Sequence, residues 1–117
     1  FNLHFFFYII MNIVRVIAFK RGKDLCKSNF KDYINQLTSE AHKQKGFIKS
    51  ESFMKSKFSY NNHLIVSISD WNSEKDWEDW KGSSVRNNIH HEYVGNIISE
   101  EFTILVKNKD RNNIFLL

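Results

Sequence analysis

Residues 70–95 read DWNSEKDWEDWKGSSVRNNIHHEYVG, and this stretch predicts a strand end followed by two short helices. Asn72 or Ser73 can cap the first helix, because a side-chain oxygen there accepts a hydrogen bond from a backbone N–H of the first turn. The sequence Gly-Ser-Ser at 82–84 interrupts the helical pattern. A second helix is therefore expected over 85–93.

The rest of the chain contains strand patterns and one longer helical pattern. Apolar side chains at i, i+3, i+4, i+7 and i+11 from Phe30 predict the longer helix. Gly46 stands where a helix C-terminus favours a residue with positive φ. Apolar β-branched runs and alternating runs predict strands. The expected elements are a strand over 13–19, a turn over 20–23 centred on Gly22, a helix over 24–45, strands over 47–54 and 63–70, the two short helices, and a last strand over 102–106.

This order of elements predicts a single α+β domain. Strand, helix, strand, strand, helix, strand is the ferredoxin-like split β-α-β arrangement, an antiparallel sheet with the helices on one face. Both alternating sets of side chains in 13–19 are apolar apart from Arg15, so the face without helices must also be covered. A symmetric homodimer in which two sheet faces meet is the economical cover.

Composition limits the classes of function. The 117 residues suit one domain, expected over 12–107, with an apolar extension at 1–11 and a tail at 108–117. The net charge of +4 is spread along the chain, which argues against nucleic-acid binding and leaves a mildly positive pocket for an anionic ligand as an alternative. The apolar start is too short and too interrupted for a membrane span. The single cysteine, Cys26, favours a reducing, cytoplasmic setting.

Several cofactor motifs are missing from the chain. Its four glycines form no phosphate-binding loop, and the order of elements is not that of a Rossmann unit, so neither flavin nor nicotinamide is expected. No two histidines have the i, i+4 spacing that places two metal ligands on one helix face, which makes a dedicated zinc site unexpected.

The segment 70–83 resembles a recurring pattern of the antibiotic-biosynthesis-monooxygenase family. That pattern is a strand ending in Trp, then Ser, then a short helix whose last turn bears Trp, then a break of small residues. The resemblance covers about 12–107 in the order of elements. It implies a dimeric α+β barrel, which agrees with the apolar sheet face inferred above.

A more specific likeness is to the haem-degrading branch of the same superfamily. That branch places a haem-distorting Trp on the short helix and the axial His ten residues later, and Trp80 and His90 have this spacing. The resemblance implies that His90 would ligate haem iron, because only one of the adjacent His90 and His91 can face a given pocket. Arg15 stands where the branch has an asparagine, with Asn12 three residues away, and Arg15 could instead bind a carboxylate or propionate.

The resemblance implies a small monooxygenase acting on a planar hydrophobic substrate between the sheet and the helices. Two chemistries stay open: haem degradation, with His90 on the iron and Trp80 against the macrocycle, and cofactor-free oxygenation, with His90 as the base for a phenol or quinol. The alternative is a non-catalytic dimeric ligand-binding or stress-related module of the same fold. An enzyme requires Trp80 and His90 in one pocket. The residues predicted to form the site are Arg15, Trp77, Trp80, Ile89, His90 and Tyr93.

Overall fold

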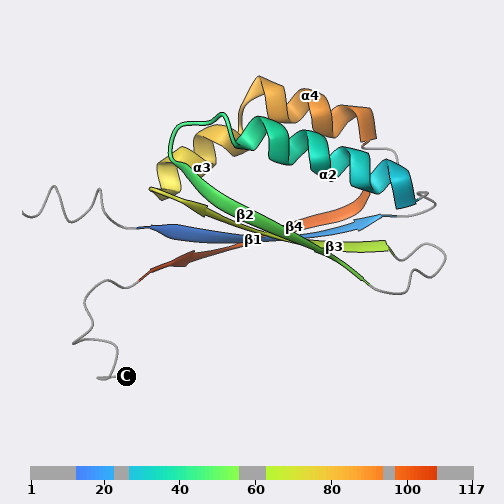
Figure 1. Ribbon diagram of the computed structural model, residues 1–117, viewed down its shortest axis with the longest axis horizontal. Helices are drawn as coiled ribbons and strands as arrows, with labels where there is room; N and C mark the ends of the chain where they lie inside the picture. The colour runs from blue at the N-terminus through green and yellow to red at the C-terminus, as the bar shows by residue number, and fades with distance from the viewer. Residues whose placement is uncertain (1–12, 23–26, 56–62, 94–96, 108–117) are drawn as a thin grey trace, which may run out of the picture.

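The computed structural model is an antiparallel sheet with helices over one of its faces (Figure 1). The residues that it describes are 13–22, 27–55, 63–93 and 97–107. The expected extension at 1–11, the tail at 108–117 and Cys26 lie outside the described residues. The elements, in chain order, are β1 (Val14–Gly22), α2 (Lys27–Ala41), β2 (Phe47–Met54), β3 (His63–Trp71), α3 (Glu74–Lys81), α4 (Ser84–Tyr93) and β4 (Ile97–Val106).

The four strands form one sheet in the order β2-β3-β1-β4. Every neighbouring pair is antiparallel, and the central strand β1 pairs with β3 on one side and β4 on the other. The helices α2, α3 and α4 all lie over the same face of the sheet (Figure 1). The structure therefore confirms the α+β, ferredoxin-like split β-α-β fold with an antiparallel sheet.

Two strand ends differ from the sequence prediction. The turn expected at 20–23 is wrong, because β1 continues to Gly22 and pairs with both of its neighbours up to that residue. The last strand begins at Ile97 rather than at residue 102, since β4 follows β1 along nearly its whole length. Pairing on both sides keeps the charged end of β1 extended where local sequence favours a turn.

Gly46 connects α2 to β2 and also contacts the start of α3. The helix α2 ends at Ala41 rather than continuing to residue 45. Gly46 has a φ of 82°, as the sequence predicts for a glycine after a helix. Its carbonyl accepts a hydrogen bond from the backbone N–H of Asn72 at 2.7 Å. A Cβ atom on Gly46 would overlap the carboxylate of Asp76, so the close approach of these segments requires glycine.

The helices α3 and α4 are two pieces separated by a break, as the sequence predicts. Ser73 caps α3, because its Oγ accepts the backbone N–H of Asp76 at 3.1 Å. The backbone N–H of Gly82 donates back to the last turn of α3 at 3.0 Å. Ser83 then starts α4 by accepting the backbone N–H of Arg86 at 3.2 Å.

The core lies between the helices and the sheet face that they cover. Val14, Val16 and Ala18 alternate along β1 with more exposed neighbours, so they point toward the helices. Tyr33 of α2 and Trp71 of β3 are almost fully buried in this layer. The other buried apolar residues are Ile34, Leu37, Ala41, Ile65, Trp77, Trp80 and Ile89.

The opposite face of the sheet carries exposed apolar side chains and is named the open face. Phe19, Phe53 and Leu105 are 36%, 53% and 48% exposed, and alternation along their strands directs them away from the helices. No described helix covers this face (Figure 1). Among the described helices, none is long and apolar enough to cross a bilayer.

Candidate functional site

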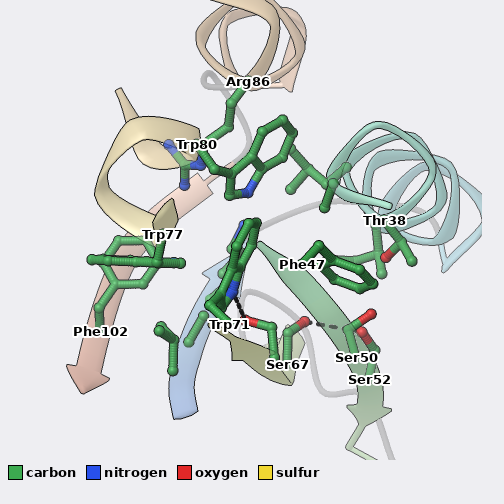
Figure 2. Close-up of a pocket in the computed structure, with 17 residues that line it drawn as sticks. Thr38, Phe47, Ser50, Ser52, Ser67, Trp71, Trp77, Trp80, Arg86 and Phe102 are labelled. Carbon is green, nitrogen blue, oxygen red and sulfur yellow. Dashed lines mark hydrogen bonds between the residues drawn. The ribbon is translucent and has the colours of Figure 1, made fainter. Parts of the chain in front are cut away.

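A cavity of about 70 Å³ lies between the sheet and the three helices. Its lining combines indole rings, serine hydroxyls and two cationic side chains (Figure 2). An interior of this size is smaller than the cavity of about 150 Å³ that holds benzene in an engineered protein core. Even a single ring therefore does not fit completely inside unless a wall moves.

Tryptophan rings form the apolar walls of the cavity. Trp71 of β3 and Trp80 of α3 lie one above the other in Figure 2. Trp77 meets Phe102 of β4 edge-on, with ring centroids 5.3 Å apart. Phe47 meets Trp71 in the same manner at 5.3 Å. These flat apolar surfaces suit a planar ligand, because aromatic rings pack well in stacked and edge-on arrangements.

Serine hydroxyls line the cavity on the sheet side. Alternation places Ser50 and Ser52 of β2 opposite Ser69 and Ser67 of β3 on the helix-facing side. The Oγ atoms of Ser52 and Ser67 are 3.0 Å apart, and Ser69 Oγ accepts the Trp71 indole N–H at 2.9 Å. Ser52 is exposed on an edge strand, so the cavity opens toward solvent at β2.

A buried ionic cluster of Lys20, Arg86 and Glu100 lies at the end of the cavity away from these serines. Glu100 Oε2 accepts hydrogen bonds from Lys20 Nζ at 3.1 Å and from Arg86 Nη2 at 2.9 Å. Lys20 and Arg86 line the cavity and are only 4% and 6% exposed. Two cations against one carboxylate leave a net positive charge, which favours an anionic oxygen in the cavity.

The ionic cluster changes the proton affinities of its members. Burial lowers the pKa of Lys20 to about 8, with Arg86 adding to this effect and Glu100 opposing it. Burial raises the pKa of Glu100, but the two cations outweigh it and hold that pKa below its ordinary value. Glu100 is therefore ionised at neutral pH, while roughly one Lys20 in ten is a neutral amine at pH 7.

Tyr33 connects the ionic cluster to α4. Its hydroxyl oxygen accepts a hydrogen bond from Lys20 Nζ at 3.2 Å and lies 3.0 Å from His90 Nδ1. Burial raises the pKa of Tyr33, so the phenol stays protonated at neutral pH. Burial also lowers the pKa of His90, which keeps its partly exposed ring neutral at pH 7.

The structure separates the residues that the sequence groups into one site. Trp77 and Trp80 lie in the cavity wall. His90 is outside the lining and contacts Tyr33 instead, so Trp80 and His90 do not share this cavity. The enzyme hypothesis that depends on these two residues in one pocket therefore fails, and a catalytic proposal has to rest on other residues of the cavity. Ile89 packs in the core, and Tyr93 packs beside Tyr33 while its hydroxyl accepts a hydrogen bond from Gln36. Neither Ile89 nor Tyr93 lines the cavity.

Arg15 lies on the open face, which corrects its predicted place beside Trp80. Alternation along β1 directs Val14 and Val16 to the helices and Arg15 away from them. Its Nε and Nη2 donate to the two carboxylate oxygens of Asp70 at 2.8 and 2.9 Å. This hydrogen-bonded ion pair holds the pKa of Asp70 below its ordinary value. Arg15 is therefore part of the open face and not of the cavity.

The residues present do not fit a haem. The cavity of about 70 Å³ is far smaller than the roughly 300–1,000 Å³ of sites that hold drug-sized ligands. The predicted iron ligand, His90, lies outside the lining, and its Nδ1 faces the Tyr33 hydroxyl. Within the described parts of the chain, no group of three His, Cys, Asp or Glu side chains is placed to hold a metal ion.

Sequence reasoning missed the polar half of the site. The sequence prediction places Lys20 in a turn and so gives it no strand face. In the structure β1 extends to residue 22, and Lys20 lies on the same face as Val16 and Ala18. Arg86 and His90 are four residues apart on α4, so helical spacing alone places them on one face. The pairing of Lys20 with Glu100 needs the β1–β4 register, which no local pattern contains.

No family model matches the chain, and no curated protein sequence matches it. Solved structures match its fold. SnoaB, a cofactor-independent oxygenase from Streptomyces nogalater, is 9% identical with a TM-score of 0.66, over 86% of this chain and 97% of SnoaB. A conserved protein from Methanosarcina mazei Go1 is 18% identical with a TM-score of 0.65, over 89% and 99% of the two chains. A hydroxynitrile lyase from Passiflora edulis is 14% identical with a TM-score of 0.67, over 85% and 96%. At these identities the likeness concerns the fold.

Proposed function

We propose that this chain is a small cofactor-independent oxygenase that takes a planar phenol or quinol into the tryptophan-walled cavity. The observation that carries the proposal is the net positive ionic cluster of Lys20, Arg86 and Glu100 beside the indole walls. An ionised phenol carries the electron density that reacts with oxygen, and fixed positive charge in a buried site stabilises that anion.

Each part of the cavity has a role in this proposal. The indoles of Trp71 and Trp80 pack against the ring of the substrate, and the serines beside them hydrogen-bond its further hydroxyls. The neutral amine form of Lys20, which its pKa of about 8 makes accessible, takes the proton from the reacting hydroxyl and becomes the ammonium of the positive cluster. Arg86 and the resulting Lys20 ammonium then stabilise the oxyanion. Lys20 therefore replaces His90 as the base, because Lys20 lines the cavity and His90 does not.

The size of the cavity restricts the substrate. Its interior of about 70 Å³ accepts part of one ring, with the remainder of the molecule at the opening beside Ser52. We therefore propose a single-ring phenol or quinol as the substrate class. A larger planar compound needs displacement of a wall such as Trp80.

The reaction balances without a cofactor. Lys20 takes the hydroxyl proton, and a ring carbon of the phenolate forms a C–O bond with molecular oxygen. The C–H bond at that carbon and the O–O bond then break. One oxygen atom remains as a quinone carbonyl. The other leaves as hydroxide, which takes up a proton and becomes water. A phenol and oxygen give a quinone and water, with four electrons passing from the substrate to oxygen.

The fold is compatible with this chemistry and does not select it. SnoaB, which shares the fold, is a cofactor-independent oxygenase. The Passiflora edulis protein, which also shares it, is a hydroxynitrile lyase. One fold can host several activities, so the proposal depends on the chemistry of the cavity.

We also propose that two copies of the chain pair through their open faces. Phe19, Phe53 and Leu105 expose apolar surface there, and an isologous contact covers both copies at once. Sedimentation should give a dimer for the parent and a monomer for Phe19→Lys. Val85→Lys, which adds the same charge at an exposed site on α4, should stay dimeric. A monomeric parent contradicts this assembly.

Oxygen consumption tests the proposed reaction. Single-ring phenols and hydroquinones are mixed with the protein, and oxygen uptake is compared with quinone formation, which should match one to one. Lys20→Met should lower the rate about 100-fold, as expected for loss of a general base. Lys75→Met, at an exposed lysine of α3, should leave it unchanged. Phenol binding seen by tryptophan fluorescence without oxygen uptake would support the non-catalytic ligand-binding alternative instead.

A further inference from the structure

We propose that Tyr33 and His90 form a proton relay that carries the substrate proton from Lys20 in the cavity to the surface of α4. The three side chains come from β1, α2 and α4 and form a continuous line of hydrogen bonds. This inference rests on the proposed function, because Lys20 receives its proton from the substrate. It gives His90 a role different from that of an iron ligand or a base in contact with substrate.

The donors and acceptors in this line have a fixed direction. A Lys20 ammonium has only donors, so the Tyr33 oxygen is the acceptor in the 3.2 Å contact. Tyr33 has a single hydroxyl proton, and His90 Nδ1 at 3.0 Å is the acceptor available to it. The relay requires that His90 carry its proton on Nε2 when the ring is neutral, so that Nδ1 accepts the Tyr33 hydroxyl proton. This tautomer leaves Nδ1 free to receive the next proton.

Burial isolates the middle of the relay from water. The Tyr33 side chain is 0% exposed and Lys20 is 4% exposed, whereas the ring of His90 is partly exposed. When the substrate occupies the cavity and its opening, the hydrogen bond to Tyr33 is the route to solvent that remains for a proton on Lys20. Tyr33 provides the connection, because its hydroxyl is both an acceptor and a donor.

The charges around the relay act on both of its ends, and transfer from Lys20 to His90 is uphill, because the pKa of Lys20 is about 8 and that of His90 lies below its ordinary value. Arg86 faces both Lys20 and His90 from α4, and Glu100 faces both from β4. The positive charge of Arg86 disfavours a proton that stays on Lys20, while His91 and Lys20 disfavour one that stays on His90. Glu100 attracts a proton at either end. A cation on His90 is thus short-lived and passes its proton to water.

The relay moves the proton in successive steps. The substrate O–H bond breaks and an N–H bond forms on neutral Lys20. Lys20 then gives a proton to the Tyr33 oxygen as the Tyr33 hydroxyl proton moves to His90 Nδ1. The imidazolium releases its Nε2 proton to water, and rotation of the partly exposed ring restores the starting tautomer. One proton has moved from the substrate to bulk water, and all three side chains regain their original charge. The hydroxide that leaves when the O–O bond breaks takes up a proton from water, so the overall reaction releases none.

The test compares Tyr33→Phe with Tyr93→Phe. Tyr33→Phe keeps the buried ring and removes the relay hydroxyl. Tyr93→Phe removes a neighbouring hydroxyl that bonds Gln36 outside the line. Under oxygen-consuming conditions, Tyr33→Phe should lower kcat about 100-fold with little change in KM. It should also raise the solvent deuterium isotope effect on kcat, because proton exit then limits turnover, while Tyr93→Phe should keep both values of the parent.

Nitrogen chemical shifts of His90 test the relay without turnover. The parent and Tyr93→Phe should show the Nε2–H tautomer with Nδ1 accepting a hydrogen bond, and Tyr33→Phe should lose that signature. Titration of Lys20 near pH 8 should also move the His90 shifts more in the parent than in Tyr33→Phe, where only the charge of Lys20 acts on His90. An Nδ1–H tautomer in the parent overturns the relay, as does a Tyr33→Phe variant with parental kcat. A parent that shows the His90 signature and consumes no oxygen contradicts the proposed oxygenase alone.

Discussion

Lys20 of β1 and Glu100 of β4 are direct partners in the sheet register, and their side chains form a 3.1 Å ion pair beneath the helices. Glu100 also binds Arg86 at 2.9 Å, so one carboxylate compensates two buried cations. A buried ion pair adds little net stability by itself, because desolvation opposes the attraction. Loss of the shared carboxylate, in contrast, leaves both cations without a counter-ion.

Glu100→Gln should therefore destabilise the fold strongly. The amide keeps the shape of the side chain and removes its charge, and breaking a buried ion pair from one side costs about 3–5 kcal/mol. Urea unfolding of parent and variant measures this difference. Glu101→Gln is the matched control, because Glu101 follows Glu100 in the chain, is exposed, and is paired in register with Phe19 on the open face. Similar losses in both variants contradict a special role for Glu100.

The depressed pKa of Lys20 should make stability rise with pH. In the unfolded chain the pKa is about 10.5, and in the folded protein burial lowers it to about 8. Between these values the unfolded state binds more protons, so the free energy of unfolding increases with pH. The destabilisation from burying the charged Lys20 is fully present below pH 8. It decreases toward pH 10 by on the order of 2 kcal/mol.

Above pH 10 the raised pKa of Tyr33 opposes this trend, because the unfolded phenol ionises first. The window from pH 8 to pH 10 therefore isolates Lys20. Unfolding midpoints measured across it should rise for the parent and stay level for Lys20→Met. A parent whose midpoint falls in this window contradicts a buried, poorly protonated Lys20.

Local sequence patterns predict the helices and strands of this protein well and its polar site poorly. The alternation in 63–70 and the helical break at 82–84 are local signals, and the structure has both. The end of β1 at Gly22 depends on strands far away in sequence, so a charged segment that favours a turn is held extended. The contact between His90 and Tyr33 depends likewise on where α2 packs. Helical spacing gives the face of α4 on which His90 lies and not the residue that it meets.

Gly46→Ala should destabilise the connection between α2 and β2. Gly46 has a φ of 82°, and a Cβ atom there would overlap the carboxylate of Asp76. The left-handed conformation alone costs an alanine about 1–2 kcal/mol, and the overlap adds to that loss. Gly82→Ala is the control, because its φ is −88° and a Cβ would lie 3.5 Å from its nearest neighbour. Thermal melting should show a lower midpoint for the first variant only.

Arg15→Met should leave the cavity chemistry unchanged. Arg15 pairs with Asp70 on the open face, on the other side of the sheet from the tryptophans. Its side chain is 50% exposed, so solvent weakens the pair and its loss should change the unfolding midpoint little. Phenol affinity and oxygen uptake should equal those of the parent at the same oligomeric state. A large loss of phenol affinity in Arg15→Met would contradict this prediction and would support the pocket position that the family resemblance implies for Arg15.

Trp80→Ala should enlarge the cavity and widen its ligand range. Trp80 is buried over Trp71, and truncation of a buried tryptophan costs about 3–5 kcal/mol because the space that it leaves is only partly refilled. An indole or two-ring phenol should bind the variant and restore part of the stability, by mass action on the folded state. Melting curves with and without 1-naphthol measure this rescue. Phe53→Ala, at a half-exposed site on the open face, should lose less stability and show no rescue. Equal rescue of both variants, or none in Trp80→Ala, contradicts the placement of Trp80 in the cavity wall.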